Sequence, residues 1–200
     1  MLEKRYALFP QRSGTLEIAR ERFVGTRGRG GVFSQQQRVN ATSESHHINV
    51  KTIPSSFSGE NWIPAKALGV KEAWTETNPV FRVGEPVNRQ LAISAIGLSD
   101  AVLPQLGKMQ VANAKVYADP PTTENRVSPD GITALQITTV GVVPTKAGDL
   151  VLPEIRIPWW NTQTDREEIA SIPSATCQVL PALGETTKVP TVTVPLSELN

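Results

Sequence analysis

The residues with the clearest capacity for chemistry surround the segment Pro158-Trp-Trp-Asn-Thr-Gln-Thr-Asp165. Three carboxylates, Asp165, Glu167 and Glu168, lie at one end of it, and a pair of carboxylates can serve as acid and base in hydrolysis. That role requires surroundings that shift a pKa, and the sequence around these residues shows none. We therefore interpret them as charged flanks that keep a hairpin tip solvated.

Trp159 and Trp160 are the best candidates for contact with a partner. Adjacent residues of a strand face opposite sides, so one ring can lie in the core while the other is exposed or half exposed. Tryptophan is also enriched where proteins bind one another. Together with Asn161 and Trp62, these residues form our predicted partner-binding set. The open alternative is that both rings of the pair are buried against the end of a sandwich or a linker.

Neither the cysteine nor the histidines indicate a reactive or metal-binding site. Cys177 is the single cysteine, so it forms no internal disulfide, and we expect it to be a small core residue of a strand over residues 175–179. His46 and His47 are adjacent and face opposite sides of a strand, so they cannot bind one metal ion from one face. The sequence also lacks a nucleophile elbow, a phosphate loop, Cys-x-x-Cys and His-Glu-x-x-His. It predicts no catalytic residues, no metal, no cofactor and no enzyme activity.

The segment Gly25-Thr-Arg-Gly-Arg-Gly-Gly31 resembles an RGG-type RNA-binding segment or an anion-binding loop. It lies between two predicted strands, however, and this position favours a long hairpin tip. The formal net charge of the 200-residue chain is +1, without a long run of one sign, so we expect no nucleic-acid partner. No apolar stretch approaches the roughly 20 residues that span a bilayer, and the opening residues lack the apolar segment of a signal peptide.

Two segments repeat one pattern, and the rest of the chain is organised around them. Residues 8–23 and 142–157 align without a gap. In each, an apolar strand ends at a proline, a glycine that tolerates positive φ follows, and apolar residues then alternate with more polar ones. The repeat predicts one structural unit used twice: strand, tight turn and strand, as at the corner of a β-sandwich. The matched pairs are Pro10 and Pro144, Gly14 and Gly148, Leu16 and Leu150, Ile18 and Leu152, Arg22 and Arg156, and Phe23 and Ile157.

The remaining chain reads as short strands joined by turns. The clearest is residues 87–95, where Val87, Arg89, Leu91, Ile93 and Ala95 alternate with more polar or smaller neighbours. At most one helical turn is expected, at residues 99–103. Further strands are predicted over residues 4–9, 15–24, 45–53, 65–74, 108–118, 132–143 and 174–180.

This rhythm predicts an all-β fold class, with tandem immunoglobulin-like β-sandwich domains of which the first is incomplete. About seven strands follow residue 65, with turn signals roughly every 8 to 12 residues, as is typical of such sandwiches. We expect residues 1–58 to be the C-terminal part of one domain, 59–183 a complete domain and 184–200 an extended tail. Trp62 follows the turn-rich boundary directly, a position typical of packing at a domain junction.

Several stretches together resemble a known family. They are Trp62-Ile-Pro-Ala65, Val83-Gly-Glu-Pro-Val-Asn-Arg-Gln-Leu91, Val143-Pro-Thr-Lys-Ala-Gly148, Leu152-Pro-Glu-Ile155 and above all Pro158-Trp-Trp-Asn-Thr-Gln-Thr164. The family is that of the bacterial aerotolerance protein BatD, also called the oxygen-tolerance family, and the resemblance covers most of the chain between Tyr6 and Pro181.

The resemblance implies a periplasmic envelope protein with a signal peptide, several immunoglobulin-like domains and a membrane anchor. It also implies protein partners with von Willebrand factor A domains, a link to oxygen or stress tolerance, and no catalytic residues to transfer. Because the sequence shows neither signal nor anchor, we expect an interior fragment whose parent is anchored in the membrane outside it.

The repeat leads to the same expectation. Far fewer residues precede the corner in its first copy than in its second, so the first unit is expected to lack its opening strands and to leave strand edges unpaired. We expect another copy of the chain, or the second domain, to cover the edges of residues 1–58. The resulting hypothesis is a non-enzymatic protein-interaction module. The alternative is a carbohydrate-binding accessory β-sandwich, in which paired tryptophans stack on sugars.

Overall fold

A computed structural model describes residues 6–27, 37–129 and 131–184 of the chain. The fold is all-β, as predicted: strands account for 56% of the described residues and form several sheets, consistent with a β-sandwich. Within the described ranges the only helix is a single 3-10 turn, Asp100–Val102, inside the predicted helical turn. No described helix is long and apolar enough to cross a membrane. The chain divides into two compact units, Met1–Trp62 and Ile63–Asn200.

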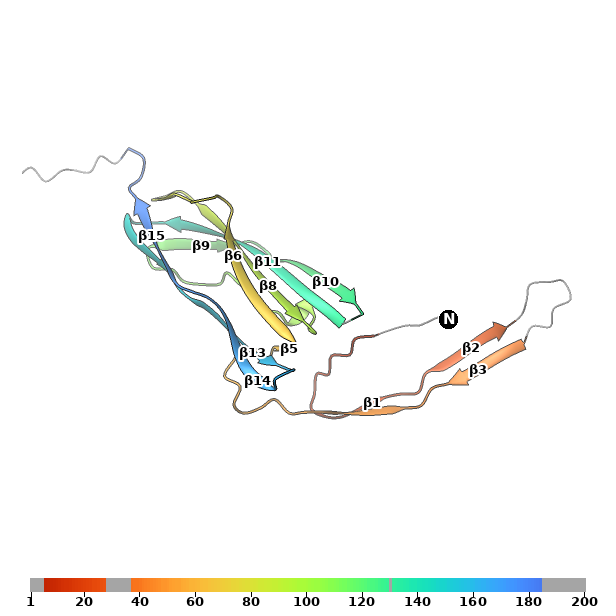
Figure 1. Cartoon of the computed structure of the whole chain (residues 1–200). Helices are drawn as coiled ribbons and strands as arrows, with labels where there is room; N and C mark the ends of the chain where they lie inside the picture. The colour runs from red at the N-terminus through yellow and green to blue at the C-terminus, as the bar shows by residue number, and fades with distance from the viewer. Residues whose placement is uncertain (1–5, 28–36, 130, 185–200) are drawn as a thin grey trace, which may run out of the picture. The chain divides into compact units, whose positions relative to one another are not determined.

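The first unit contains one two-stranded ribbon (Figure 1). Its strands are β1 (Gly14–Ile18), β2 (Arg22–Arg27), β3 (Gln37–Thr42) and β4 (His46–Val50). β1 pairs antiparallel with β4, and β2 pairs antiparallel with β3. The strand predicted over residues 15–24 is therefore interrupted at residues 19–21, and the described residues of the strand predicted over 4–9 are not in a strand. The glycine-rich segment predicted as the hairpin tip spans residues 25–31, and its residues 28–31 lie outside the described residues.

One layer of the second unit is an antiparallel sheet. Its members are β6 (Ala67–Trp74), β8 (Val87–Ile96), β9 (Ala114–Ala118), β10 (Thr122–Ser128) and β11 (Gly131–Pro144). The strand order is β10-β11-β8-β6, and β9 pairs with the C-terminal part of β11. The predicted strand over residues 87–95 is confirmed as β8, and its burial alternates as predicted, with Arg89 among the buried positions.

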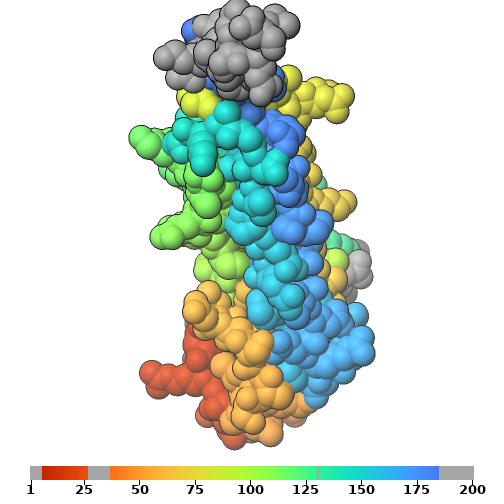
Figure 2. Space-filling view, turned by 90° about the vertical axis from the view of Figure 1, so that its left-hand side faces the viewer, coloured from red at the N-terminus to blue at the C-terminus, as the bar shows by residue number. Residues whose placement is uncertain are grey.

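The other layer is built from a second long ribbon, which Figure 2 shows in cyan and blue along one face of the unit. Its strands are β12 (Gly148–Leu152), β13 (Ile155–Asn161), β14 (Arg166–Ile172) and β15 (Ala175–Leu180). β12 pairs with β15 and β13 pairs with β14. Two-residue strands extend this layer in parallel pairings: β5 (Pro64–Ala65) on β13 and β7 (Phe81–Arg82) on β15.

Aliphatic side chains from both layers form one hydrophobic core. Leu91 and Ile93 of β8 and Val140 of β11 are fully buried and belong to the same cluster as Leu150 and Leu152 of β12. Because β11 and β12 lie in different sheets, the turn between Pro144 and Gly148 carries the chain from one layer to the other. The predicted sandwich corner is confirmed for the second copy of the repeat.

The repeat extends over all four strands of each ribbon. Gly14 and Gly148 adopt φ of 107° and 105°, and each begins a five-residue strand with the same alternating burial. The strand register is also the same: Gly14 pairs with Val50 as Gly148 pairs with Val179. Beyond the interruption, Arg22 pairs with Thr42 as Arg156 pairs with Ser171. The two ribbons are therefore two copies of one structural element.

Candidate functional site

Both tryptophans of the predicted partner-binding pair are buried, Trp159 at 4% and Trp160 at 8% exposure. Trp159 belongs to the hydrophobic core, whereas Trp160 does not and donates from its indole nitrogen to Asp165 Oδ1 at 3.2 Å. The rings do face opposite sides of β13, but the expectation that one of them is exposed is wrong. The alternative, in which both rings are buried, holds, because the hairpin loop that follows Trp160 supplies a hydrogen-bond acceptor for its indole N–H. The described conformation offers neither ring as a stacking platform for a sugar.

Asn161, also buried, organises the hairpin loop. Its side-chain oxygen accepts hydrogen bonds from the backbone N–H groups of Gln163 at 2.9 Å and Thr164 at 3.2 Å. Its side-chain nitrogen donates to Glu168 Oε1 at 2.9 Å. Asp165 completes the loop with a φ of 52°, a left-handed conformation that aspartate tolerates better than most residues. The carboxylates of Asp165 and Glu168 thus shape the hairpin through hydrogen bonds.

The same hairpin holds the first residues of the second unit. The backbone N–H of Trp160 donates to the carbonyl of Ile63 at 2.9 Å, and that of Thr162 donates to the carbonyl of Ala65 at 2.9 Å. The Thr162 hydroxyl donates to the same Ala65 oxygen at 3.1 Å. The sequence analysis did not predict this contact. The only sequence feature that could have indicated it is the pair of apolar residues Ile63 and Ala65 on either side of a proline.

Trp62, the fourth predicted residue, lies in the first unit, where its half-buried ring packs edge-on against Phe57 at 5.0 Å between centroids.

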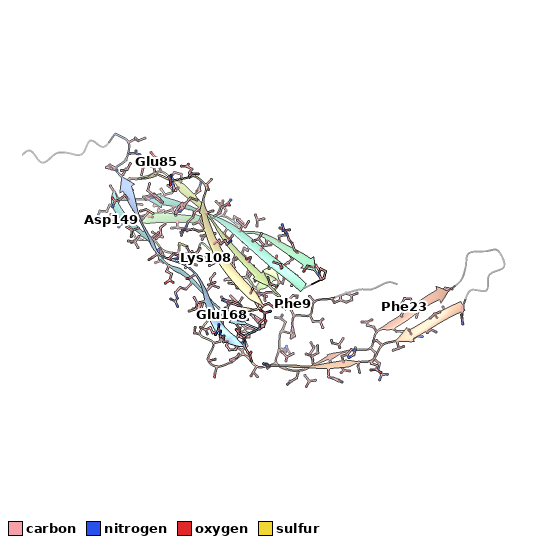
Figure 3. The ribbon with its side chains drawn as sticks, in the orientation of Figure 1. Phe9, Phe23, Glu85, Lys108, Asp149 and Glu168 are labelled. Carbon is pink, nitrogen blue, oxygen red and sulfur yellow. The ribbon has the colours of Figure 1, made fainter. Side chains whose placement is uncertain are left out.

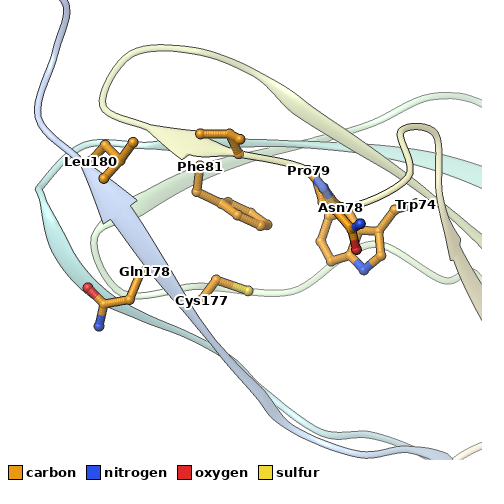
Figure 4. A pocket seen from close by; sticks show the side chains of 8 residues that line it. Trp74, Asn78, Pro79, Phe81, Cys177, Gln178 and Leu180 are labelled. Atoms are coloured by element: carbon orange, nitrogen blue, oxygen red, sulfur yellow. The ribbon is translucent and has the colours of Figure 1, made fainter.

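A groove of about 590 Å³ lies along β15 in the second unit (Figure 4). Cys177 lines it together with Trp74 and Phe81, whose rings pack edge to face at 5.4 Å. Burial raises the pKa of the Cys177 thiol, the charge of Glu72 raises it further, and Arg89 opposes them. The thiol therefore remains protonated at neutral pH, which is the state expected of a small core residue. The groove is therefore better suited to contact an apolar group than to present a reactive thiolate.

The ribbon of the first unit presents an apolar face to solvent. We call Leu16, Ile18, Phe23, Val39, Ile48 and Val50 the apolar ribbon face. Leu16 and Ile48 share one side of the β1–β4 pair, Phe23 and Val39 share one side of the β2–β3 pair, and Ile18 and Phe23 line the same hollow. No side chain within residues 6–26 and 37–62 is buried.

A hollow of about 890 Å³ opens on this ribbon and is lined in part by Ile18, Phe23 and Ala41. Phe23 of β2, labelled in Figure 3, is one of these lining residues and is 58% exposed. Its ring lies across Gly25, where a Cβ atom would approach the ring to 2.8 Å. Gly25 occupies the position in the first repeat that Trp159 occupies in the second.

The equivalent face of the second ribbon is core. Ile157, which matches Phe23, is 5% exposed, and Leu150 and Leu152, which match Leu16 and Ile18, are both 1% exposed. The sheet β10-β11-β8-β6 contributes the other side of that core. The first ribbon therefore repeats the sequence pattern and register of a core-forming layer, without a covering layer among the described residues of its own unit.

Comparison with known proteins returned no match: no family model, no curated protein and no solved structure matches this chain. Among the described residues, no group of three or more His, Cys, Asp or Glu side chains is placed to hold a metal ion. The fold and the surfaces define an all-β protein with an exposed apolar ribbon in its first unit and a two-layer core in its second.

Proposed function

We propose that this chain is a non-enzymatic protein-interaction module of a BatD-like periplasmic protein, which scaffolds an envelope complex linked to oxygen or stress tolerance. In this proposal the two units are tandem immunoglobulin-like β-sandwich domains, the first of them incomplete. The second unit's antiparallel strands, its core and its Pro144–Gly148 corner support the finer fold. The sequence resemblance, strongest at residues 158–164, supports the family and the periplasmic location.

One observation carries the binding function: on the apolar ribbon face Phe23, Val39 and Ile48 are exposed and the other three residues are only half-buried, whereas the counterpart of this face in the second unit forms core. Contiguous exposed apolar surface marks interaction sites in soluble domains. Burial of such surface yields about 25 cal/mol per Å², so a partner that covers Phe23 and Ile48 gains affinity from their removal from water. The binding site of the proposal is thus this face, and the role of Trp159, Trp160 and Asn161 is to hold the second unit together.

The proposed partners are proteins with von Willebrand factor A domains from the same system, bound by a parent chain that is anchored in the membrane outside residues 1–200. The test measures binding of a purified partner of this class to the immobilised chain by biolayer interferometry. Phe23→Lys is the test variant, and Val24→Lys is its control. Val24 is the next residue of β2, faces the other side of the strand and has a similar exposure of 52%.

If the proposal is right, the wild-type chain and the Val24 variant bind, and the Phe23 variant binds at least about tenfold more weakly, as expected of an aromatic interface anchor. Absence of binding by the wild-type chain would refute this class of partner. Equal binding by all three forms would place the site away from the apolar ribbon face.

A further inference from the structure

One edge of the second unit's antiparallel sheet is formed by β10. This strand ends the order β10-β11-β8-β6, so it has β11 on one side and no described strand on the other (Figure 1). All seven of its residues are exposed, including Val127 at 83%. The edge of such a strand presents backbone N–H and C=O groups with which another strand can pair.

The backbone groups that face this free edge follow from the hydrogen bonds on the other side of β11. The N–H of Gly97, just after β8, donates to the carbonyl of Ile132 at 2.7 Å, so Ile132 points its backbone groups toward β8. These directions alternate along a strand, so the odd-numbered residues of β11 bond toward β10, where they lie opposite even-numbered residues. The odd-numbered residues of β10 therefore direct their N–H and C=O groups toward the free edge. They are Thr123, Asn125 and Val127.

Prolines limit any further pairing to β10 itself. Pro121 directly precedes the strand and Pro129 directly follows it. Neither has an N–H to donate, so neither extends a ladder of hydrogen bonds. The available edge is thus Thr122–Ser128, and Asn125 lies at its centre.

Two charged side chains of β10 are complementary to themselves about a two-fold axis. Glu124 and Arg126 lie on one side of the strand, where Arg126 Nε donates to Glu124 Oε1 at 2.7 Å. If a second β10 pairs antiparallel with Asn125 opposite Asn125, each Glu124 lies opposite the other copy's Arg126. A shift of two residues in either direction places Glu124 opposite Glu124 or Arg126 opposite Arg126, and like charges directly opposite destabilise a sheet. The charges therefore select the centred register.

We infer that the free edge of β10 is a dimer interface, at which a second copy of this chain adds its own β10 antiparallel with the two-fold axis at Asn125. About six backbone hydrogen bonds form, because Thr123, Asn125 and Val127 of each copy each offer one donor and one acceptor. The sheets of the two copies become one continuous sheet, and this isologous contact is closed. The inference goes beyond the proposed function, since it concerns the second unit and requires no partner on the apolar ribbon face.

The charges account for a second copy as the occupant of this edge. Charged residues on an edge strand usually prevent pairing with other chains. On β10 they oppose the shifted registers and favour the centred one, a condition that an identical strand fulfils without further requirements. The hydrogen bond from Arg126 lowers the pKa of Glu124, so its carboxylate is charged at neutral pH. Exposed ion pairs add little affinity, so the backbone hydrogen bonds supply the affinity and the charges supply the register.

Sedimentation equilibrium of the full chain, from about 1 to about 300 µM, tests the inference, and we expect a monomer–dimer equilibrium for the wild-type chain. Val127→Pro removes an N–H that faces the free edge but none that bonds to β11, so it should raise the dissociation constant at least about tenfold. Val127→Thr retains that N–H and should change the constant less than about twofold. A wild-type chain that is monomeric throughout this range, or equal effects of the two variants, would overturn the inference.

Charge reversal tests the register with variants that keep every backbone N–H. Glu124→Arg alone and Arg126→Glu alone should each weaken self-association at least about threefold, because each places like charges opposite each other across the axis. An equimolar mixture of the two single variants should recover the dimer, since each arginine then lies opposite a glutamate of the other variant. A mixture that associates no better than its components, or single variants that dimerise like the wild type, would refute this arrangement.

Discussion

Arg89 and Glu72 form an ion pair inside the second unit, with Arg89 Nη1 donating to Glu72 Oε2 at 2.8 Å from β8 to β6. Arg89 is only 2% exposed. Its guanidinium lies 5.7 Å from the centre of the Trp74 ring, its opposite residue on β6, and Nη2 donates to Met109 Sδ at 2.9 Å. The positive charge in the core is thus balanced by one carboxylate, one aromatic face and one sulfur.

Loss of the Glu72 carboxylate should be costly, because it leaves the Arg89 charge buried and unpaired. We expect Glu72→Ala to lower the free energy of unfolding of the second unit by about 3 kcal/mol. The control is Glu124→Ala, which removes a pair of similar length, 2.7 Å to Arg126, whose partners are both exposed. That change should leave the urea midpoint nearly unchanged, because water screens an exposed pair. Urea unfolding followed by tryptophan fluorescence measures both, and equal costs would contradict the burial argument.

Asn161 should stabilise the hairpin rather than bind a partner. Its replacement by alanine removes two acceptor contacts to backbone N–H groups and one donor contact to Glu168, so we expect a loss of about 1 to 3 kcal/mol in unfolding free energy. Gln163→Ala, in the exposed part of the same loop, is the control and should be nearly neutral. An unchanged urea midpoint for Asn161→Ala would show that these hydrogen bonds contribute little.

Gly148 should be sensitive to any side chain because of its backbone conformation. A Cβ there would meet no atom within 4 Å, so the cost of Gly148→Ala comes only from the φ of 105°. We expect a loss of about 1 to 3 kcal/mol in unfolding free energy. Gly69→Ala in β6 provides the comparison, since Gly69 lacks a positive φ and its nearest neighbour, Ser94 Oγ, is 4.0 Å away. If both variants unfold at the same urea concentration, backbone strain is not the cause.

Cys177 should react slowly with alkylating reagents at neutral pH. Burial, followed by the charge of Glu72, raises the pKa of its thiol, so the folded chain holds the proton at pH values where the unfolded chain begins to release it. This contribution to stability is therefore present below the thiol pKa of the unfolded chain and is lost as the pH rises through that of the folded chain. The rate of iodoacetamide alkylation against pH, in buffer and in concentrated urea, measures the difference. A midpoint in buffer at or below that in urea would contradict it.

Much of the strand pattern could be predicted because it depends on neighbours in the sequence. The period of two over residues 87–95 identified the buried side of β8, including Arg89, since alternate side chains of a strand always share a face. The proline-to-glycine repeat identified the corner before β12, because proline ends strand pairing and glycine permits positive φ. The interruption of the first ribbon at residues 19–21 carried no comparable local signal.

The candidate site was predicted less well, because burial depends on residues distant in the sequence. Alternation correctly placed Trp159 and Trp160 on opposite sides of β13, but it could not show that a loop folds back so that Asp165 accepts from the Trp160 indole. The pairing of β5 with β13 joins residues almost a hundred positions apart, and no local pattern encodes that contact.

The sequence by itself determined the all-β class, the faces of the regular strands and the corner before β12, because backbone sterics and side-chain alternation act over a few residues. Only the tertiary structure decided which of two equivalent apolar faces is covered. Leu150 and Leu16 occupy the same position in the repeat, yet a sheet buries the first completely and the second is only half-buried. The reason is that burial is a property of what packs against a strand, and the strand's own residues do not specify that partner.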